Sequence, residues 1–223
     1  MKISAIILTK TGENLDRCLK SVDFCDEKLV IKGEVVDFSN QRNLAMKKAK
    51  NEWILFVDAD EEVTPELKFE IRNLKFENSC YYIKRRDFFW GKELKFGETR
   101  KLRNLGIIRL VKKNSGQWVG KVHETFKTDK PVGRLNNFLN HYPHPTLKEF
   151  IEKINYYSTL RADELYRAGK RFYLHEVVLL PFFKFILNYF VYFGLLDGVP
   201  GFVYAFLMSF HSFLVRAKLY KRA

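Results

Sequence analysis

The stretch that decides the fold is Trp53-Ile54-Leu55-Phe56-Val57-Asp58-Ala59-Asp60-Glu61. A continuous apolar run that ends at acidic side chains is typical of a central strand in a parallel sheet, which helices cover on both faces. Ligands of open α/β sheets bind at the carboxyl ends of the strands. Asp58 and Asp60 are therefore expected at a ligand site, where both carboxylates can turn toward one divalent cation. A solvated acidic loop is the other interpretation of an isolated Asp-x-Asp triplet.

Strand and helix patterns alternate on both sides of that run. Residues 3–8 and 28–32 have the pattern of short strands, and residues 15–22 and 39–50 that of helices. A further helix should begin at Thr64-Pro65-Glu66, which supplies a cap, a proline in the first helical position and an acid in the first turn. The sequence therefore predicts an α/β fold with a mostly parallel sheet flanked by helices.

The pattern changes twice further along the chain. Residues 80–142 read as strands separated by glycine-containing and charged loops. Thr146 and Glu149 then form a capping box, which predicts a long amphipathic helix to about Gly169. We expect an α/β domain over residues 1–142 and a helical region over residues 143–223.

The tail is unusually aromatic. Residues 172–220 hold 15 of the 35 aromatic side chains, and residues 177–196 are apolar apart from Pro181, Lys184 and Asn188. About 20 such residues suffice to cross a bilayer, but aromatic helices flanked by Lys and Arg also suit attachment at the membrane surface. Packing on the α/β domain, or on a second subunit in a homo-oligomer, is another use. Interfacial membrane attachment ranks first, protein packing second and a full crossing third.

Composition limits the classes of function. The chain has 223 residues with 39 Lys and Arg against 26 Asp and Glu, a formal charge of +13, and 47% hydrophobic residues. Such a chain has enough apolar and aromatic residues to form a core, unlike a disordered one. The excess charge suits nucleic acid, anionic lipid or a phosphate-bearing substrate. Nucleic acid is the least favoured partner because no nucleic-acid motif is present. The three cysteines lack metal or disulfide spacing, which indicates reduced thiols.

An ordered set of motifs resembles family 2 of the inverting glycosyltransferases, and within it the bacterial transferases of the lipopolysaccharide core and other envelope glycans. The matching segments cover nearly the whole chain: Ile6-Ile7-Leu8-Thr9-Lys10, Gln41-Arg42-Asn43, residues 53–61, Phe89-Trp90-Gly91-Lys92, Ile108-Arg109-Leu110, residues 118–124 and Leu196-Asp197-Gly198-Val199-Pro200-Gly201.

The resemblance implies a GT-A fold, a nucleotide-diphosphate sugar as donor, inversion at the anomeric carbon, and Mg²⁺ or Mn²⁺ as cofactor. It also implies a lipid-linked or envelope glycan acceptor and a place at the cytoplasmic face of the inner or plasma membrane, peripheral or monotopic. The donor contacts that follow from it are Thr9, Arg42, Asn43, Asp58, Arg109 and Trp118, and the metal ligands are Asp58, Asp60 and His123.

Glu124 is the candidate catalytic base. Related enzymes keep their acidic base at the place of the Trp-x-Gly-x-x-His-Glu segment, and direct displacement needs one base for the acceptor hydroxyl. An ion pair between Glu124 and an arginine is the structural alternative. His123 has two alternatives to a metal-binding role, which are to orient Glu124 or simply to form a hydrogen bond.

The sequence departs from the family at the nucleotide loop. The second strand normally leads into an Asp-x-x-Ser-x-Asp-type loop, a helix and a third strand, whereas Lys32 is here followed within a few residues by the Gln-Arg-Asn segment. Thr11 also stands where asparagine is usual, and Glu34 or Asp37 is left as a nucleoside contact. A catalytically impaired transferase-fold scaffold at the membrane is therefore the alternative function.

Overall fold

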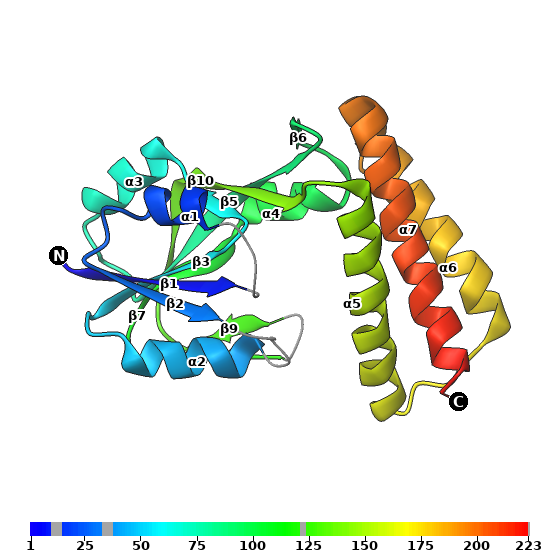
Figure 1. Ribbon diagram of the computed structural model, residues 1–223, viewed down its shortest axis with the longest axis horizontal. Helices are drawn as coiled ribbons and strands as arrows, with labels where there is room; N and C mark the ends of the chain where they lie inside the picture. Colours follow the sequence, from blue (N-terminus) through cyan, green and yellow to red (C-terminus); the bar gives the residue numbers. More distant parts are fainter. Residues whose placement is uncertain (10–14, 33–37, 121–123, 223) are drawn as a thin grey trace. The chain divides into compact units, whose positions relative to one another are not determined.

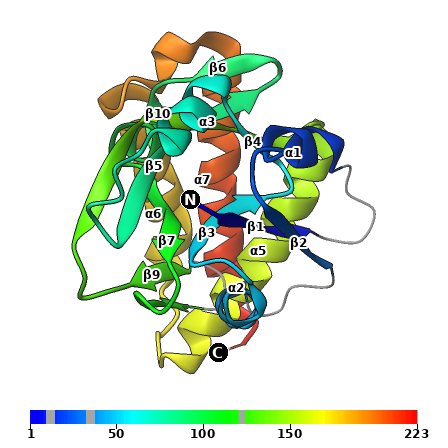
Figure 2. The ribbon, with the colours of Figure 1, turned by 90° about the vertical axis from the view of Figure 1, so that its left-hand side faces the viewer.

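The computed structural model describes residues 1–9, 15–32, 38–120 and 124–222. These form two compact units (Figures 1 and 2), of which unit 1 comprises residues 1–86 and 102–142, and unit 2 comprises residues 87–101 and 143–223. Each unit is described by itself below.

Three parallel strands begin unit 1. Strand β1 (Ile3–Thr9) lies between β2 (Glu27–Lys32) and β3 (Trp53–Asp58), with Leu8 opposite Asp58. Every residue of β1 is buried, as are the first five of β3, because helices cover both faces of the sheet. Helices α1 (Asp16–Ser21) and α3 (Pro65–Arg72) pack on one face, and α2 (Phe38–Lys48) packs on the other.

The later strands extend this sheet in antiparallel fashion. The strand order is β2-β1-β3-β7-β5-β10-β4, with β4 at Glu61–Val63, β5 at Cys80–Phe89, β7 at Ile107–Lys112 and β10 at Val132–His144. The short helix α4 (Arg100–Leu105) precedes β7, and β8 (Gln117–Val119) pairs with β9 (Thr125–Lys127) as a separate hairpin. The predicted α/β fold with a sheet flanked by helices is confirmed.

Unit 2 is mainly helical. Helix α5 (Leu147–Arg167) begins at the predicted capping box, since the Thr146 hydroxyl accepts from the Glu149 N–H at 3.2 Å and donates to its carboxylate at 3.1 Å. It is followed by α6 (Leu174–Ile186), η2 (Leu187–Val191), η3 (Gly194–Asp197) and α7 (Gly198–Tyr220). Helix α7 lies between α5 and α6, which run beside it (Figure 1).

The segment that closes the α6–α7 hairpin is held by buried polar groups. The Asp197 carboxylate accepts from the backbone N–H groups of Lys95 and Phe96, both at 3.0 Å, which lie between β6 (Lys92–Leu94) and η1 (Gly97–Thr99). A Cβ on Gly201 would lie 2.2 Å from the carbonyl oxygen of Gly194. Glycine is therefore required where α7 begins.

Two helical stretches of unit 2 are long and apolar enough to cross a membrane by length and composition. They are Leu174–Val191 and Gly194–Tyr220. Only 11% and 28% of their most apolar stretches are buried in the structure, so these are not ordinary core helices.

Replacement of Gly201 by alanine should destabilise unit 2 by about 2–4 kcal/mol, because the new methyl group overlaps backbone that cannot move away cheaply. Chemical denaturation followed by circular dichroism measures this loss. Gly169→Ala is the matched control, since a Cβ there meets nothing within 4 Å and only the left-handed φ of +72° is strained. That control should cost about 1 kcal/mol, and equal effects of the two variants would contradict the packing argument.

Candidate active site

The candidate site begins where β3 ends. Asp58 is the last residue of β3, and the next N–H, that of Ala59, donates to the Leu8 carbonyl of β1 at 3.1 Å. The chain then enters β4 at Glu61, so Asp58-Ala59-Asp60 forms the connection between a buried strand and an edge strand. The acidic motif thus lies at the carboxyl end of a parallel strand, where the sequence placed it.

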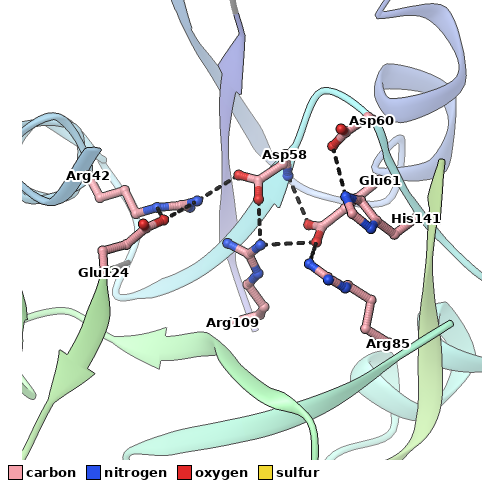
Figure 3. A network of polar contacts seen from close by, with 8 residues as sticks. All are labelled: Arg42, Asp58, Asp60, Glu61, Arg85, Arg109, Glu124 and His141. Carbon is pink, nitrogen blue, oxygen red and sulfur yellow. Dashed lines mark hydrogen bonds and ion pairs between the residues drawn. The ribbon is translucent and has the colours of Figure 1, made fainter. Parts of the chain in front are cut away.

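Two arginines hold the Asp58 carboxylate (Figure 3). Arg42 Nη2 of α2 donates to Oδ1 at 2.6 Å, and Arg109 Nη2 of β7 donates to Oδ2 at 2.5 Å. Both guanidinium groups are buried, with side-chain exposures of 1% and 5%. Burial by itself would raise the pKa of Asp58, but Arg109 and Arg42 outweigh it and lower the pKa from 3.8 to about 2. Asp58 is therefore ionised at neutral pH.

Glu61 completes this cluster from the other side. Its carboxylate is fully buried, accepts from the Asp58 N–H at 3.0 Å and from Arg109 Nη2 at 3.0 Å, and lies 3.8 Å from Arg85 Nη1. Arg109 is thus shared between two acids, which raises the pKa of its guanidinium despite burial. In the sequence, Glu61 directly follows the motif, but nothing there assigns it a role. Its partner Arg85 lies in the charged stretch 84–86, which has the composition of a solvent-exposed surface.

Glu124 lies on the opposite side of Arg42 from the other acids. Arg42 Nε donates to Glu124 Oε1 at 3.2 Å, so this one arginine joins the acidic motif to the candidate base (Figure 3). The guanidinium also lies 4.8 Å from the ring centroid of Trp118 and 5.5 Å from that of Phe56. An ion pair of Glu124 with an arginine, which the sequence left as an alternative, is therefore present in the structure.

Asn43 and Trp118 fix β8, the strand that precedes Glu124. Asn43 Nδ2 donates to the Trp118 carbonyl, and the Trp118 N–H donates back to Asn43 Oδ1, both at 2.9 Å. The side chain amide therefore pairs with the backbone of β8 as a neighbouring strand would. This pair positions Trp118 over Arg42 and explains why asparagine follows the arginine in the sequence.

Asp60 points away from the arginines and toward β10. Its Oδ1 lies 3.5 Å from His141 Nε2, with side-chain exposures of 30% and 13% (Figure 3). The antiparallel pairing of β10 with β4 places His141 opposite Glu61, which explains this proximity. Sequence reasoning missed His141, and its only signal was a histidine near the end of a predicted strand.

The remaining predicted residues are placed as follows. Thr9 is buried at the carboxyl end of β1, one position beyond the pair of Leu8 and Asp58. His123, and also Thr11, Glu34 and Asp37, lie outside the described residues. Within the part of the chain that is described, no three His, Cys, Asp or Glu side chains are grouped as a complete metal site. The structure thus brings together Arg42, Asn43, Asp58, Arg109, Trp118 and Glu124, with Asp60 beside His141.

An acidic motif at the carboxyl end of a strand, held by buried arginines, defines a polar site in an α/β fold. The model of the family described as glycosyl transferase family 2 matches residues 10–120. The chain is 26% identical to the lipopolysaccharide core biosynthesis glycosyltransferase LpsC of Rhizobium meliloti, over 100% of this chain and 93% of LpsC. It is 27% identical to an uncharacterized glycosyltransferase of Rickettsia typhi, over 98% and 86% of the two chains.

Among solved structures, residues 1–349 of TarS from S. aureus in complex with UDP-GlcNAc align with 13% identity and a TM-score of 0.43, over 100% of this chain and 91% of that one. The chain belongs to glycosyl transferase family 2. It is a glycosyltransferase. Its α/β unit has the predicted sheet flanked by helices.

Replacement of Asp58 by asparagine should lower the free energy of unfolding at pH 7 by about 2–4 kcal/mol, because two buried guanidinium groups lose a charged partner. The pKa of Asp58 is lower in the folded protein than its ordinary value, so its stabilising contribution is complete above about pH 4 and is lost as the pH falls through about 2. The difference between wild type and variant should therefore shrink over that range.

Urea titrations at several pH values measure both effects. Asp129→Asn is the control, since the Asp129 side chain is 85% exposed and its contact with Lys130 is 3.6 Å long. A change of at most about 0.5 kcal/mol is expected there. A pH-independent difference between wild type and Asp58→Asn would show that the ionised carboxylate does not stabilise the fold.

Proposed function

We propose that this protein transfers a sugar, with inversion, from a nucleotide-diphosphate donor to a lipid-linked or cell-envelope glycan acceptor of the lipopolysaccharide-core kind. The observation that carries the proposal is the Asp58-Ala59-Asp60 motif at the carboxyl end of β3. Arg42 binds both Asp58 of this motif and the carboxylate of Glu124. The similarity to LpsC over the whole chain supports the class of acceptor.

The side chains of Asp60 and His141 could serve together as ligands of a divalent cation. A carboxylate and an imidazole lie 3.5 Å apart, both partly exposed, and ions such as Mg²⁺ or Mn²⁺ are commonly bound by one or two protein ligands with phosphate oxygens and water. Asp58 differs, because guanidinium groups take both of its oxygens. We assign the cation to Asp60, with His141 or the sequence-predicted His123 as its second ligand, and give Asp58 the role of orienting the arginines. When bound, such a cation offsets charge on the departing diphosphate.

Hydrogen-bond donors around Asp58 suit an anionic ligand. Within the described residues, Nη1 of Arg42 and Nε1 of Trp118 are buried and have no acceptor, which is costly in a site without a ligand. Phosphate oxygens of a donor accept from guanidinium groups in a fixed geometry. We therefore assign diphosphate binding to Arg42, with Trp118, Asn43, Arg109 and Thr9 around it.

Glu124 is the proposed base. In the reaction the acceptor hydroxyl oxygen forms a bond to the anomeric carbon while the bond from that carbon to the diphosphate oxygen breaks, and the hydroxyl proton passes to Glu124. Arg42 Nε holds Oε1 at 3.2 Å, so that the carboxylate is fixed and the other oxygen is assigned to receive the proton. Since Arg42 also bonds to Asp58, one side chain aligns the base with the motif that receives the donor.

The place of action that we propose is the cytoplasmic face of the inner or plasma membrane. Two apolar helices of unit 2 suit attachment to a lipid surface. A catalytically impaired scaffold remains the alternative, based on the short segment between β2 and α2.

Glu124→Gln should lower the rate of sugar transfer by about 10²–10⁴-fold and leave donor affinity within about 3-fold, because a glutamine keeps the contact with Arg42 but accepts no proton. Transfer from a radiolabelled nucleotide sugar to envelope lipid extract measures the rate, and calorimetry measures donor affinity. Glu77→Gln, at an exposed loop position, is the control. Full activity of Glu124→Gln would refute the assigned base, and retention of the cellular role without transfer would favour the scaffold.

His141→Ala should weaken Mn²⁺ binding in the presence of nucleoside diphosphate by about 10–100-fold, with a comparable loss for Asp60→Ala, because each removes one of few protein ligands. Electron paramagnetic resonance of free Mn²⁺ measures the affinity directly. His175→Ala in α6 is the control for a general loss of imidazole. If His141→Ala binds Mn²⁺ as wild type does and His123→Ala binds it more weakly, the second ligand is His123 and not His141.

A further inference from the structure

Helices α6 and α7 expose many large apolar side chains. We call this set the apolar face; its members, each 36–70% exposed, are Val178, Phe182, Phe183, Leu187 and Phe190 in α6 and η2, and Val199, Phe202, Phe206, Phe210 and Phe213 in α7. The α7 members recur at three- and four-residue spacing and form one stripe. An exposed apolar surface of this kind marks a membrane or protein interaction site.

The tip of the hairpin is tied to a charged segment of the same unit. The Gly97 N–H donates to the Tyr192 carbonyl at 3.0 Å, and Lys92 Nζ donates to the Asp197 carbonyl at 2.7 Å. Glu98 accepts from Lys184 Nζ at 3.3 Å and from Asn188 Nδ2 at 3.4 Å. Lys184 and Asn188 interrupt the apolar stretch in the sequence, and the structure pairs both with this segment.

The open end of the hairpin is basic. Exposed Lys170 and Arg171 precede α6, and exposed Lys221 follows α7. Helix α5 lies along the other side of α7, where Lys218 Nζ bonds to oxygens of Asn155, Ser158 and Thr159 at 2.6–2.8 Å. Charged groups therefore occupy both ends of the hairpin and one flank.

A hairpin that crossed the bilayer would have to carry its tip, and the segment bound to it, to the far side. That segment includes Lys92, Glu93, Lys95 and Glu98, and each charged residue must pass the bilayer centre, where it costs about 2.5–3.5 kcal/mol. A hairpin lying in the plane of the interface meets no such cost. Its tip segment and its basic end then both stay among the headgroups, while only the apolar face enters the acyl region.

We propose that the α6–α7 hairpin lies flat in one leaflet of an anionic membrane, with the apolar face among the acyl chains and the basic end on the headgroups. This deepens the attachment to a membrane surface proposed above. A lipid surface is favoured over a second copy of the chain because positively charged residues flank the face, which would repel each other across a self-association contact and attract acidic lipid. The hydrogen bonds between the tip and the segment Lys92–Thr99 keep that end of the hairpin at the headgroups.

Binding of the full chain to vesicles tests whether lipid covers the apolar face. The double variant Phe182→Ser/Phe206→Ser should bind vesicles of one part phosphatidylglycerol to three parts phosphatidylcholine at least 10-fold more weakly than wild type in co-sedimentation. Phe69→Ser on α3, where the phenylalanine is 71% exposed, is the matched control and should bind as wild type does. Arg171→Glu/Lys221→Glu should lose affinity for anionic vesicles and show little change with phosphatidylcholine alone.

Labelling with a membrane-impermeant maleimide tests the orientation. Lys95→Cys reports on the tip segment and Arg171→Cys on the open end, and the three native cysteines are buried, so wild type gives the background. With protein added to the outside of sealed vesicles, both positions should be labelled to a similar extent. Protection of Lys95→Cys until detergent is added would overturn the flat orientation in favour of a crossing.

Two further outcomes separate the hypotheses. Absence of vesicle binding by wild type, together with a dimer that Phe182→Ser/Phe206→Ser dissociates, would overturn the membrane proposal and assign the face to a second copy. Nucleotide-sugar binding in solution is measured on the same samples. If it persists without vesicle binding, only the membrane inference fails; if vesicles bind and nucleotide sugars do not, the donor assignment fails.

Discussion

The structure of the site depends on one carboxylate between two buried guanidinium groups. Asp58 ends β3, Arg42 comes from α2 and Arg109 from β7, so that three separate segments meet at one ion cluster. Buried charges are tolerated only when they are paired and hydrogen-bonded. Each of these three charged groups therefore needs its partners to remain buried. The ion cluster also holds together the three backbone segments that carry them. Glu61 and Glu124 extend the same cluster in two directions through Arg109 and Arg42.

This arrangement divides the acidic residues by role. Asp58 and Glu61 bind arginines and build the site. Asp60, by contrast, turns out of the cluster to His141, and Glu124 Oε1 lies 3.2 Å from both Nε and Nη2 of Arg42. Asp60, which lies beside an imidazole, is the acid assigned to a cation, and Glu124, which contacts Arg42 through Oε1, is the acid assigned to accept a proton. The arginines in turn bring positive charge to the carboxyl end of the sheet, where an anionic donor is expected, and so part of the chain's +13 charge has a local use.

The sequence predicted the fold because its local signals agree with the tertiary structure. The apolar run 53–57, the capped helix start at Thr64 and the capping box at Thr146 each depend on neighbours in the chain, and each appears where expected. The ion pairs of the site join residues 16 to 82 positions apart, and no local pattern encodes such pairs. His141 was missed for this reason, since only the pairing of β10 with β4 brings it to Asp60. The same holds for the segment Lys92–Thr99, whose bonds to Asp197 and Tyr192 place it with the helical unit.

We assign the cluster around Asp58 to the binding of a nucleotide sugar, with Asp60 at its edge. Thermal denaturation of the full chain with a panel of nucleotide sugars, each with and without Mn²⁺, tests this most directly. We expect at least one nucleotide sugar to raise the Tm of wild type in the presence of Mn²⁺ and to leave the Tm of Asp60→Ala unchanged, because ligand binding stabilises the folded state. If no nucleotide sugar shifts the Tm of wild type, or if Asp60→Ala responds as wild type does, the account is contradicted.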